Sequence, residues 1–404
     1  MMRVLHLKTR EILSKFGITR QTLANWTKYG NLKIKKRPNG RYLWDKESIE
    51  SLNNYVDLKA AGIKPVGNNK DTFNIENRRY LGAKSRMLDF IDKVVRENTS
   101  GVRTIADIFA GTGVVTNLFF SQGKDVIVND ILDSNFMVYQ TFFGSDRVRE
   151  KLLKDKISQM NALPGDDNYV SVNYGNKYFS ESNARKIGEA RAFIERQTKL
   201  TSREKDILLT SLLYAMDKVA NTVGHYDAYR KVLDNIAPIH FKYPNLEVKS
   251  SLTRIYHEDA NELVRKIEAD LVYIDTPYNS RQYGDVYHVL ENVIDWKKPK
   301  LFGVAMKPKD RSKTKSLYST SKAPEAFEDL VTHIKAKYIL VSYNNMAHKG
   351  VGRSNAKISN EEIVSILKKR GRVQIFEEPF QVFTTGKTNI KDHKELLYLV
   401  EVMK

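Results

Sequence analysis

The sequence contains no cysteine among its 404 residues. Disulfide bonds, thiolate-bound zinc, cysteine-ligated iron–sulfur clusters and a cysteine nucleophile are therefore excluded. It also lacks any apolar run near the roughly 20 residues that a membrane-spanning helix needs. Its start, MMRVLHLKTR, lacks the apolar region of a signal peptide. We therefore expect a soluble, cytoplasmic protein of a bacterial or archaeal cell, with no membrane partner.

Acidic residues are too few to balance the basic ones. Lysine and arginine number 67 against 48 aspartates and glutamates, which gives a formal net charge of +19. Such an excess needs a polyanionic partner, and nucleic acid is the first candidate. At roughly 150 residues per domain, the length predicts two or three folded units.

Residues 8–50 predict a small separate unit. Two short amphipathic patterns flank a turn at Gly17, and Thr19 has the place and type of an N-cap. A basic hairpin with an Asn-Gly turn follows at residues 33–44, and a further helix from about Asp45. This order resembles the winged helix-turn-helix of MerR-like and excisionase-like families, which implies binding of duplex DNA; the alternative is a helical hairpin with a solvated basic face. The second helix would contact DNA through Arg20, Gln21, Thr22, Asn25 and Lys28.

The rest of the chain alternates strand-like and helical patterns, which is typical of an α/β fold with a mostly parallel sheet. The expected strands are residues 105–109, 125–130, 271–275 and 338–343. A long helical stretch rich in Lys, Arg, Tyr and Asn interrupts this alternation. We predict a DNA-binding domain at 1–58, a linker at 59–75, an α/β core made of 76–130 and 251–404, and an inserted subdomain at 131–250.

The segment from Thr104 to Gly113 predicts a strand that runs into a glycine turn and then a helix. About 20 residues further on, a second strand ends at Asp130, whose carboxylate can accept hydrogen bonds from ribose hydroxyls. The turn has no third glycine at dinucleotide spacing, and the chain has no P-loop. The two strands together predict a site for a nucleoside-bearing cofactor.

The strand that ends in Asp275-Thr276-Pro277-Tyr278 carries groups suited to methylating an exocyclic amine. The lone pair of such an amine is delocalised into the base, so a catalyst must place acceptors on its hydrogens. The carboxylate of Asp275 and the backbone carbonyl of Thr276 can do this. Pro277 makes the turn rigid, and Tyr278 offers an aromatic face to a base that has left the duplex.

These motifs occur in the order found in Dam-like, alpha-group N6-adenine DNA methyltransferases of restriction–modification systems, which residues 78–404 resemble. The resemblance implies a Rossmann-like fold, S-adenosyl-L-methionine as cofactor, double-stranded DNA as substrate and a helical target-recognition insertion. It also implies a monomer on DNA and a cognate restriction endonuclease as genetic partner. Thr276 replaces the first proline of the family's usual catalytic tetrapeptide. The implied cofactor contacts are Tyr80, Lys84 (to the cofactor carboxylate), Asp107, Phe109, Gly111, Gly113, Asp130 and Asp259 (to its adenine).

Two further segments are candidates for contact with DNA. Residues 221–229 resemble a segment of these methylases in their DNA-contacting region and contain His225 and Tyr229. No metal ligand is suitably spaced around His225. The basic run from Lys297 to Lys315 could hold phosphates, and a merely solvated loop is nearly as good an interpretation.

The missing cysteine excludes methylation of cytosine at C5, which requires a cysteine nucleophile. Methylation of cytosine N4 needs a similar geometry, but the enzymes concerned usually carry serine where Asp275 stands. Adenine is therefore favoured. The remaining alternatives are an N4-cytosine DNA methyltransferase, an RNA methyltransferase, and a DNA-binding regulator whose α/β domain senses a ligand.

Overall fold

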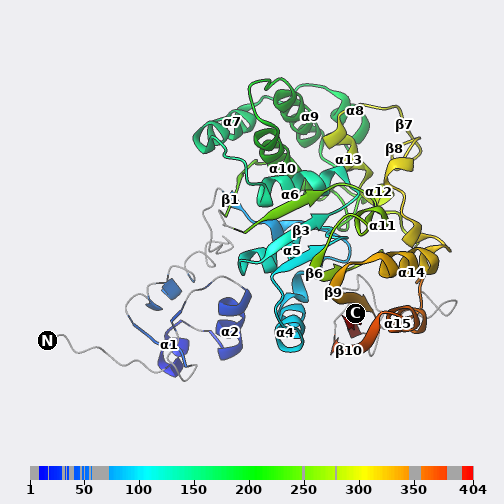
Figure 1. Cartoon of the computed structure of the whole chain (residues 1–404). Coiled ribbons are helices and arrows are strands. Elements are labelled where there is room, and N and C mark those ends of the chain that lie inside the picture. Colours follow the sequence, from blue (N-terminus) through cyan, green and yellow to red (C-terminus); the bar gives the residue numbers. More distant parts are fainter. Residues whose placement is uncertain are drawn as a thin grey trace. The chain divides into compact units, whose positions relative to one another are not determined.

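The computed structural model divides the chain into two compact units, Met1–Thr72 and Phe73–Lys404. Figure 1 follows the chain from its N-terminus in blue to its C-terminus in red. The residues that the structure describes are 9–16, 18–29, 32, 34–35, 41–45, 48–49, 51–53, 56, 72–247, 251–277, 280–344, 356–379 and 394–403.

The first unit contains two short helices, α1 (Thr9–Lys15) and α2 (Arg20–Tyr29). Thr19 caps α2, because its Oγ1 accepts a hydrogen bond of 3.0 Å from the backbone N–H of Thr22. The predicted N-cap is therefore confirmed. Apolar side chains of this unit form a small core of their own: Ile12, Leu23, Leu32, Trp44 and Leu52.

The predicted basic hairpin is described only in part. The backbone N–H of Leu43 donates to the carbonyl of Lys35 over 2.8 Å, which joins the two arms. The Asn-Gly turn at 39–40 lies outside the described residues, and the resemblance to a winged helix-turn-helix stays a prediction. Most of the predicted linker 59–75 also lies outside them; from residue 72 the chain already forms β1 (Thr72–Phe73) and η1 (Ile75–Asn77).

The second unit is built on a seven-stranded sheet in the order β10-β11-β9-β6-β2-β3-β5. From β9 to β5 all neighbours are parallel, while β11 pairs antiparallel with both β9 and β10. The predicted mixed, mostly parallel sheet is therefore confirmed, and each predicted strand is present. The strands are β2 (Thr104–Asp107), β3 (Asp125–Asn129), β5 (Thr253–Tyr256), β6 (Ala269–Ile274), β9 (Ala336–Asn344), β10 (Gly371–Pro379) and β11 (Lys394–Val402).

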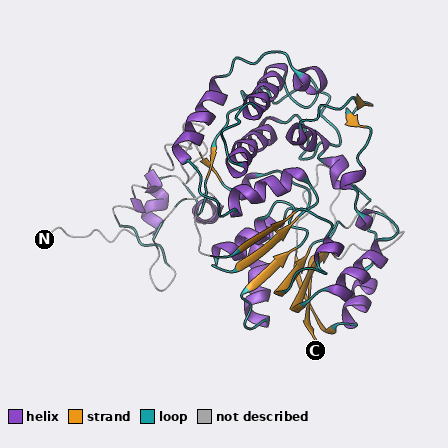
Figure 2. Ribbon diagram, turned by 45° about the horizontal axis from the view of Figure 1, so that its top comes forward, coloured by secondary structure: helices purple, strands orange, loops and turns teal. Residues whose placement is uncertain are grey.

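Helices cover both faces of this sheet, as Figure 2 shows. Successive side chains of a strand point to opposite faces, so a parallel strand buried on both sides is apolar along its whole length. Ile105 and Val126 belong to one core, and Ala106 and Ile127 belong to the other. The first core also contains side chains of α4 (Leu88–Asn98), α5 (Val114–Ser121), α6 (Asp133–Phe143) and α13 (His288–Asp295), and the second those of α11 (Ala260–Leu263), α14 (Ala323–His333) and α15 (Asn360–Lys368).

The stretch predicted as an inserted subdomain is largely helical. Its helices share one continuous hydrophobic core with a face of the sheet. The longest of them, α10, begins with a capping box in which Thr201 and Glu204 bond each other's backbone N–H groups. These helices are α7 (Glu150–Ala162), α8 (Tyr169–Tyr174), α9 (Glu181–Glu195) and α10 (Ser202–Val219).

Short elements complete the second unit. Two of its strands form a hairpin, β7 with β8, that follows α13. Among the described residues, no helix is long and apolar enough to cross a membrane. The short elements are η2 (Lys84–Arg86), β4 (Tyr243–Pro244), α12 (Tyr283–Val286), β7 (Leu301–Phe302), β8 (Lys307–Pro308), η3 (Ser312–Thr314) and η4 (Leu317–Ser319).

Candidate active site

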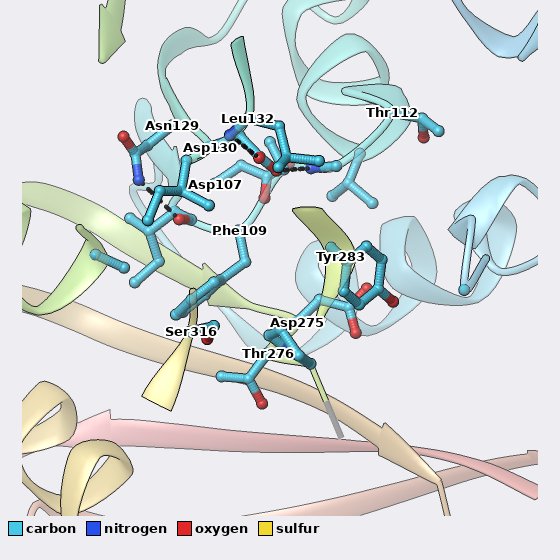
Figure 3. A pocket seen from close by; sticks show the side chains of 18 of the residues that line it. Asp107, Phe109, Thr112, Asn129, Asp130, Leu132, Asp275, Thr276, Tyr283 and Ser316 are labelled. Atoms are coloured by element: carbon cyan, nitrogen blue, oxygen red, sulfur yellow. Dashed lines mark hydrogen bonds between the residues drawn. The ribbon is translucent and has the colours of Figure 1, made fainter. Parts of the chain in front are cut away.

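A pocket lies at the carboxyl ends of β2, β3 and β6, where an α/β sheet leaves a crevice for ligands. It encloses about 950 Å³ of space, its open mouth included, and Figure 3 shows many of its side chains. Its lining brings together most of the residues predicted for cofactor and chemistry. These are Tyr80, Lys84, Asp107, Phe109, Gly111, Asp130, Asp259, Asp275, Thr276 and Pro277.

The glycine turn after β2 packs tightly against its neighbours. Gly111 (φ +53°) and Gly113 (φ +76°) both have left-handed backbone conformations that favour glycine. A Cβ on Gly111 would lie 3.3 Å from Cε1 of Tyr80. A Cβ on Gly113 would lie 3.0 Å from Cδ1 of Ile75 and from Cε1 of Tyr139. Gly111 lines the pocket and Gly113 does not, so Gly113 serves the packing behind the turn.

Asp130 is fixed beside this turn by backbone hydrogen bonds. Its Oδ2 accepts one of 3.0 Å from the N–H of Gly111, and its Oδ1 accepts one of 2.9 Å from the N–H of Leu132. Burial raises the pKa of Asp130, and these hydrogen bonds oppose the rise. Because each carboxylate oxygen has two lone pairs, Asp130 keeps capacity to accept hydrogen bonds from a ligand's hydroxyl groups.

Asp107, the last residue of β2, is buried under the turn. Its Oδ2 accepts hydrogen bonds from the N–H and Oγ1 of Thr116, over 3.1 and 2.8 Å. Its Oδ1 is buried and accepts no hydrogen bond from any described residue. Burial raises the pKa of Asp107 to about 7, and the charge of Asp275 adds to the rise. Because Asp107 lines the pocket, a polar group of a ligand could supply the missing hydrogen bond.

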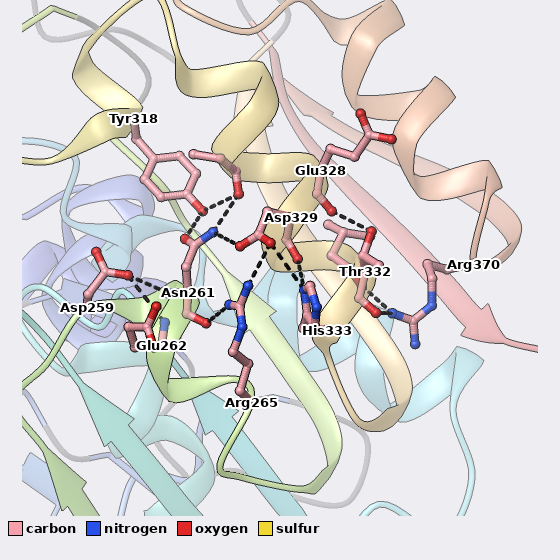
Figure 4. A network of polar contacts seen from close by, with 12 residues as sticks. Asp259, Asn261, Glu262, Arg265, Tyr318, Glu328, Asp329, Thr332, His333 and Arg370 are labelled. Carbon is pink, nitrogen blue, oxygen red and sulfur yellow. Dashed lines mark hydrogen bonds and ion pairs between the residues drawn. The ribbon is translucent and has the colours of Figure 1, made fainter.

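An aromatic pair forms one wall of the pocket. Phe109 and Tyr318 meet edge to face, with ring centroids 5.1 Å apart. The hydroxyl of Tyr318 donates to Oδ1 of Asn261 over 2.8 Å, and Figure 4 shows how Asn261 also bonds Asp329 on α14. Asp259 caps α11, its Oδ1 accepting from the N–H of Asn261 over 2.9 Å. One network thus fixes Tyr318 and the turn that carries Asp259.

Tyr80 belongs to a second aromatic cluster. Its ring stacks on that of Tyr287, with centroids 4.5 Å apart and planes 2° apart, and Tyr283 lies 5.5 Å away. The hydroxyl of Tyr287 accepts a hydrogen bond of 2.7 Å from the N–H of Leu81. Tyr80 and Tyr283 both line the pocket, so stacked rings set the shape of this wall.

A buried ion pair supports this cluster from behind. The side chain of Arg78 is 0% exposed, and its Nε lies 3.7 Å from Oδ2 of Asp217. Its Nη1 donates to Oδ1 of Asn135 over 2.7 Å, and Nδ2 of Asn135 donates to the hydroxyl of Tyr80 over 3.2 Å. On the far side, the hydroxyl of Tyr226 donates to Oδ1 of Asp217 over 2.9 Å. Sequence reasoning missed both Arg78 and Asp217.

Three charged side chains meet at the end of β6, and we call them the charge triad: Lys84, Asp275 and Glu395. Nζ of Lys84 lies 3.1 Å from Oδ1 of Asp275 and 3.9 Å from Oε2 of Glu395. Burial raises the pKa of Asp275 to about 6; Lys84 opposes this rise and Glu395 adds to it. The ammonium group of Lys84 thus pairs with Asp275, and its predicted contact with the carboxylate of a cofactor stays a prediction.

The other predicted contacts lie away from the pocket lining. Tyr229 packs edge to face on Tyr178, with centroids 5.2 Å apart. The pKa of His225 is lowered by burial and by the nearby charge of Arg281. Tyr278 lies outside the described residues. Contact of His225 and Tyr229 with DNA therefore stays a prediction.

The predicted DNA-contacting residues of the first unit lie on α2. Arg20 is exposed and Thr22 is half-buried. The side chains of Gln21, Asn25 and Lys28 lie outside the described part of the structure.

The basic run from Lys297 to Lys315 uses part of its charge internally. Lys307 pairs with Asp227, Arg311 with Asp285 and Lys313 with Asp133. Lys298 lies over the ring of Trp296, 4.6 Å from its centroid. Because these carboxylates neutralise their partners, the run offers less charge to phosphates than its sequence suggests.

Sequence reasoning also missed the segment after β8, which supplies Thr314, Ser316 and Tyr318 to the pocket. Gln282 holds this segment in place: its Nε2 donates to the carbonyl of Ser316 over 3.0 Å, and its Oε1 accepts from the N–H of Ser316 over 2.7 Å. The sequence of this loop is rich in Lys, Ser and Thr and has no periodicity that would predict which of its side chains point into the pocket. The aromatic residue Tyr318 within this polar stretch could have indicated a buried position.

The mostly parallel sheet, with a pocket at the carboxyl ends of its strands, defines an α/β protein with a ligand site and agrees with the S-adenosylmethionine-dependent methyltransferase fold. The chain belongs to the D12 class N6 adenine-specific DNA methyltransferase family, whose sequence profile matches residues 80–351, about two thirds of its length.

Curated relatives agree with this family. "Modification methylase StsI" of Streptococcus sanguinis is 36% identical over 345 residues, covering 80% of this chain and 51% of that protein. "Modification methylase LlaI" of Lactococcus lactis subsp. lactis is 32% identical over 338 residues, covering 78% of this chain and 52% of that protein. The chain thus spans about half the length of these two. "Type II methyltransferase M.NlaIII" of Neisseria lactamica is 29% identical over 345 residues, covering 80% of this chain and 98% of that protein.

Proposed function

We propose that the protein is a site-specific DNA methyltransferase that transfers a methyl group from S-adenosyl-L-methionine to N6 of adenine in duplex DNA, within a restriction–modification system. The observation that carries this proposal is the position of Asp275. Its carboxylate lines the same pocket as the glycine turn and Asp130. Family membership and the modification methylases among the relatives support the same reaction.

The pocket suits this cofactor in its chemistry. Its lining combines apolar and aromatic side chains with a few polar groups, as is usual for cofactor sites. Asp130 would accept hydrogen bonds from the ribose hydroxyls, and the aromatic wall of Phe109 and Tyr318 would pack on the adenine, whose edge Asp259 would read. The backbone at Gly111 would approach the cofactor closely, because a side chain there would meet the ring of Tyr80. Asp107 lines the same pocket, and its Oδ1, which accepts no hydrogen bond from the described residues, could accept one from a polar group of the cofactor.

When bound, S-adenosylmethionine would supply its sulfonium methyl group as the electrophile for the adenine N6 lone pair, with the neutral thioether as the leaving group. The protein's part is to make that lone pair available. The carboxylate of Asp275 accepts a hydrogen bond from one N6 hydrogen, and the carbonyl of Thr276 accepts one from the other. Asp275 then takes the proton that the methylated amine loses. Its raised pKa of about 6 makes it a better proton acceptor than an ordinary aspartate.

Adenine is favoured over the alternatives by Asp275 and by the family. Cytosine N4 would use the same pocket, and RNA would present the same exocyclic amine to it. A ligand-sensing regulator would need the pocket without the acceptors at the end of β6. Both acceptors, Asp275 and Thr276, line the pocket beside the proposed cofactor site.

The decisive experiment is transfer of tritiated methyl from S-adenosylmethionine to mixed-sequence duplex DNA, with RNA tested beside it. Label in N6-methyladenine at one short sequence is the expected result; label in N4-methylcytosine or in RNA alone would contradict the proposed substrate. Asp275→Asn should lower the single-turnover rate by roughly 100- to 1,000-fold, since it removes a proton acceptor that acts in the transition state. Cofactor affinity should change less than about threefold, because Asp275 acts on the amine. Loss of cofactor binding would refute this role.

The contacts with DNA are proposed for two parts of the chain. The helical stretch 131–250 would read the target sequence, with His225 and Tyr229 in the segment that faces DNA. The first unit would add affinity or specificity through α2, or repress the protein's own promoter; a capped helix with exposed Arg20 supports this. Deleting residues 1–58 and measuring methylation and operator binding tests both roles, and unchanged values in both assays would exclude them. The enzyme would act as a monomer beside a cognate endonuclease.

A further inference from the structure

Glu395 is a carboxylate in an unusual place. It lies in β11, opposite Asn344 of β9, and its side chain is only 9% exposed. Leu397 and Leu399 follow at alternate positions of the strand, so their side chains point to the same face of the sheet as Glu395. Both belong to the first of the two hydrophobic cores. A buried charge in such a strand destabilises the fold unless a partner compensates it, so Glu395 requires an explanation.

One partner of Glu395 is the lysine that also pairs with the proposed catalytic aspartate. Nζ of Lys84 lies 3.9 Å from Oε2 of Glu395 and 3.1 Å from Oδ1 of Asp275. The three side chains are 9% (Glu395), 6% (Lys84) and 16% (Asp275) exposed, so little water screens their charges. One positive charge is therefore divided between two carboxylates.

We propose that Glu395 is a positioning residue for methyl transfer: it draws Lys84 partly away from Asp275 and keeps the Asp275 carboxylate basic enough to take the proton from N6. This role rests on the proposed function. Without Glu395, Lys84 would neutralise Asp275 fully and weaken it as a proton acceptor. Without Lys84, two neighbouring carboxylates would lose the cation that lies beside both of them.

The charges that face Asp275 agree with this role. Lys84 of η2 lowers the pKa of Asp275, and Glu395 of β11 raises it. Two further titratable groups face Asp275: Asp107 of β2 and Tyr273 of β6, whose own pKa values its charge raises. Tyr273 stays neutral at physiological pH. Removal of Glu395 and removal of Lys84 must therefore shift the titration of Asp275 in opposite directions.

The test is the pH dependence of the single-turnover rate, with cofactor and DNA saturating so that the chemical step is measured. In Glu395→Gln the acid limb should move to lower pH by about one unit, since a neighbouring negative charge is lost. The plateau rate should fall several-fold, because the acceptor is less basic. In Lys84→Met the acid limb should move to higher pH. Glu401→Gln, at an exposed position of the same strand, is the matched control and should leave the profile unchanged.

A second readout does not depend on activity. Burial raises the pKa of Glu395 above its ordinary value, so this group costs stability as pH rises through the interval between its unfolded and folded pKa values. The melting temperature of Glu395→Gln relative to wild type should therefore rise as pH increases from about 4 to 8. Glu395→Asp should restore most of the wild-type rate profile, because the charge is kept.

The outcomes separate the two proposals. An inactive wild-type protein would refute the proposed function and this role with it. An active wild type whose profile coincides with that of Glu395→Gln would refute only the role of Glu395. A purely structural Glu395 would lower the rate equally at all pH values and leave the acid limb in place, which would also refute the role.

Discussion

Substitution of Gly113 by alanine should destabilise the second unit and weaken cofactor binding, although Gly113 does not line the pocket. Its φ of +76° is a conformation that costs an alanine roughly 1–2 kcal/mol. The new Cβ would also lie 3.0 Å from side-chain atoms of both Ile75 and Tyr139, which is a tight contact, so these side chains would have to move by a few tenths of an ångström. Overpacking of this kind costs about 1–3 kcal/mol, so the expected total is roughly 2–5 kcal/mol.

The loss of affinity follows from Tyr139. Its hydroxyl donates a hydrogen bond of 2.7 Å to the carbonyl of Gly111, which lines the pocket. A methyl group on Gly113 would push the ring of Tyr139 and thus shift the turn that we propose approaches the cofactor. Isothermal titration with S-adenosylmethionine should show an affinity at least about tenfold weaker, which corresponds to about 1.4 kcal/mol.

Gly123→Ala is the matched control for the strain alone. Gly123 has a similar φ of +79°, but a Cβ there would meet nothing within 4 Å. It should lose only about 1–2 kcal/mol in calorimetric unfolding and keep cofactor affinity. If the two variants lost equal stability, or if Gly113→Ala bound the cofactor like wild type, the inferred packing of Tyr139 behind the turn would be wrong.

Two further predictions concern buried charges. Arg78→Met should destabilise the second unit by about 3–5 kcal/mol, because it removes the buried cation beside Asp217. Arg79→Met should cost far less, because the charge of Arg79 also acts on Asp217 but from an exposed side chain; equal melting temperatures of the two variants would refute this. Burial raises the pKa of Asp206 to about 7, so this carboxyl reduces stability as pH rises from about 4 to 7. Asp206→Asn should therefore melt higher than wild type above pH 7 and like wild type near pH 4, and a constant difference across this range would contradict the assignment.

The local motifs were predictable because they depend on neighbours in the sequence. The run Asp125–Asn129 is apolar enough to bury both of its faces, which is typical of an internal strand of a parallel sheet. The turn after β2 contains glycine because its backbone has positive φ, which glycine adopts most easily. The N-cap at Thr19 likewise follows from a hydroxyl three residues before an N–H. From these local features the sequence alone predicts the order of the strands along the chain and the positions of the pocket residues from Asp107 to Asp130.

The tertiary structure alone decided which distant side chains meet at Asp275. Lys84 comes from the start of the second unit and Glu395 from its last strand, and no spacing in the sequence connects them. The sequence therefore did not predict that Lys84 pairs with Asp275 and Glu395. Tyr318 and the Arg78–Asp217 pair could not be predicted from the sequence for the same reason. The contact partner of a charge or an aromatic ring depends on which element the fold places within a few ångströms. That placement depends on how the helices pack on the sheet.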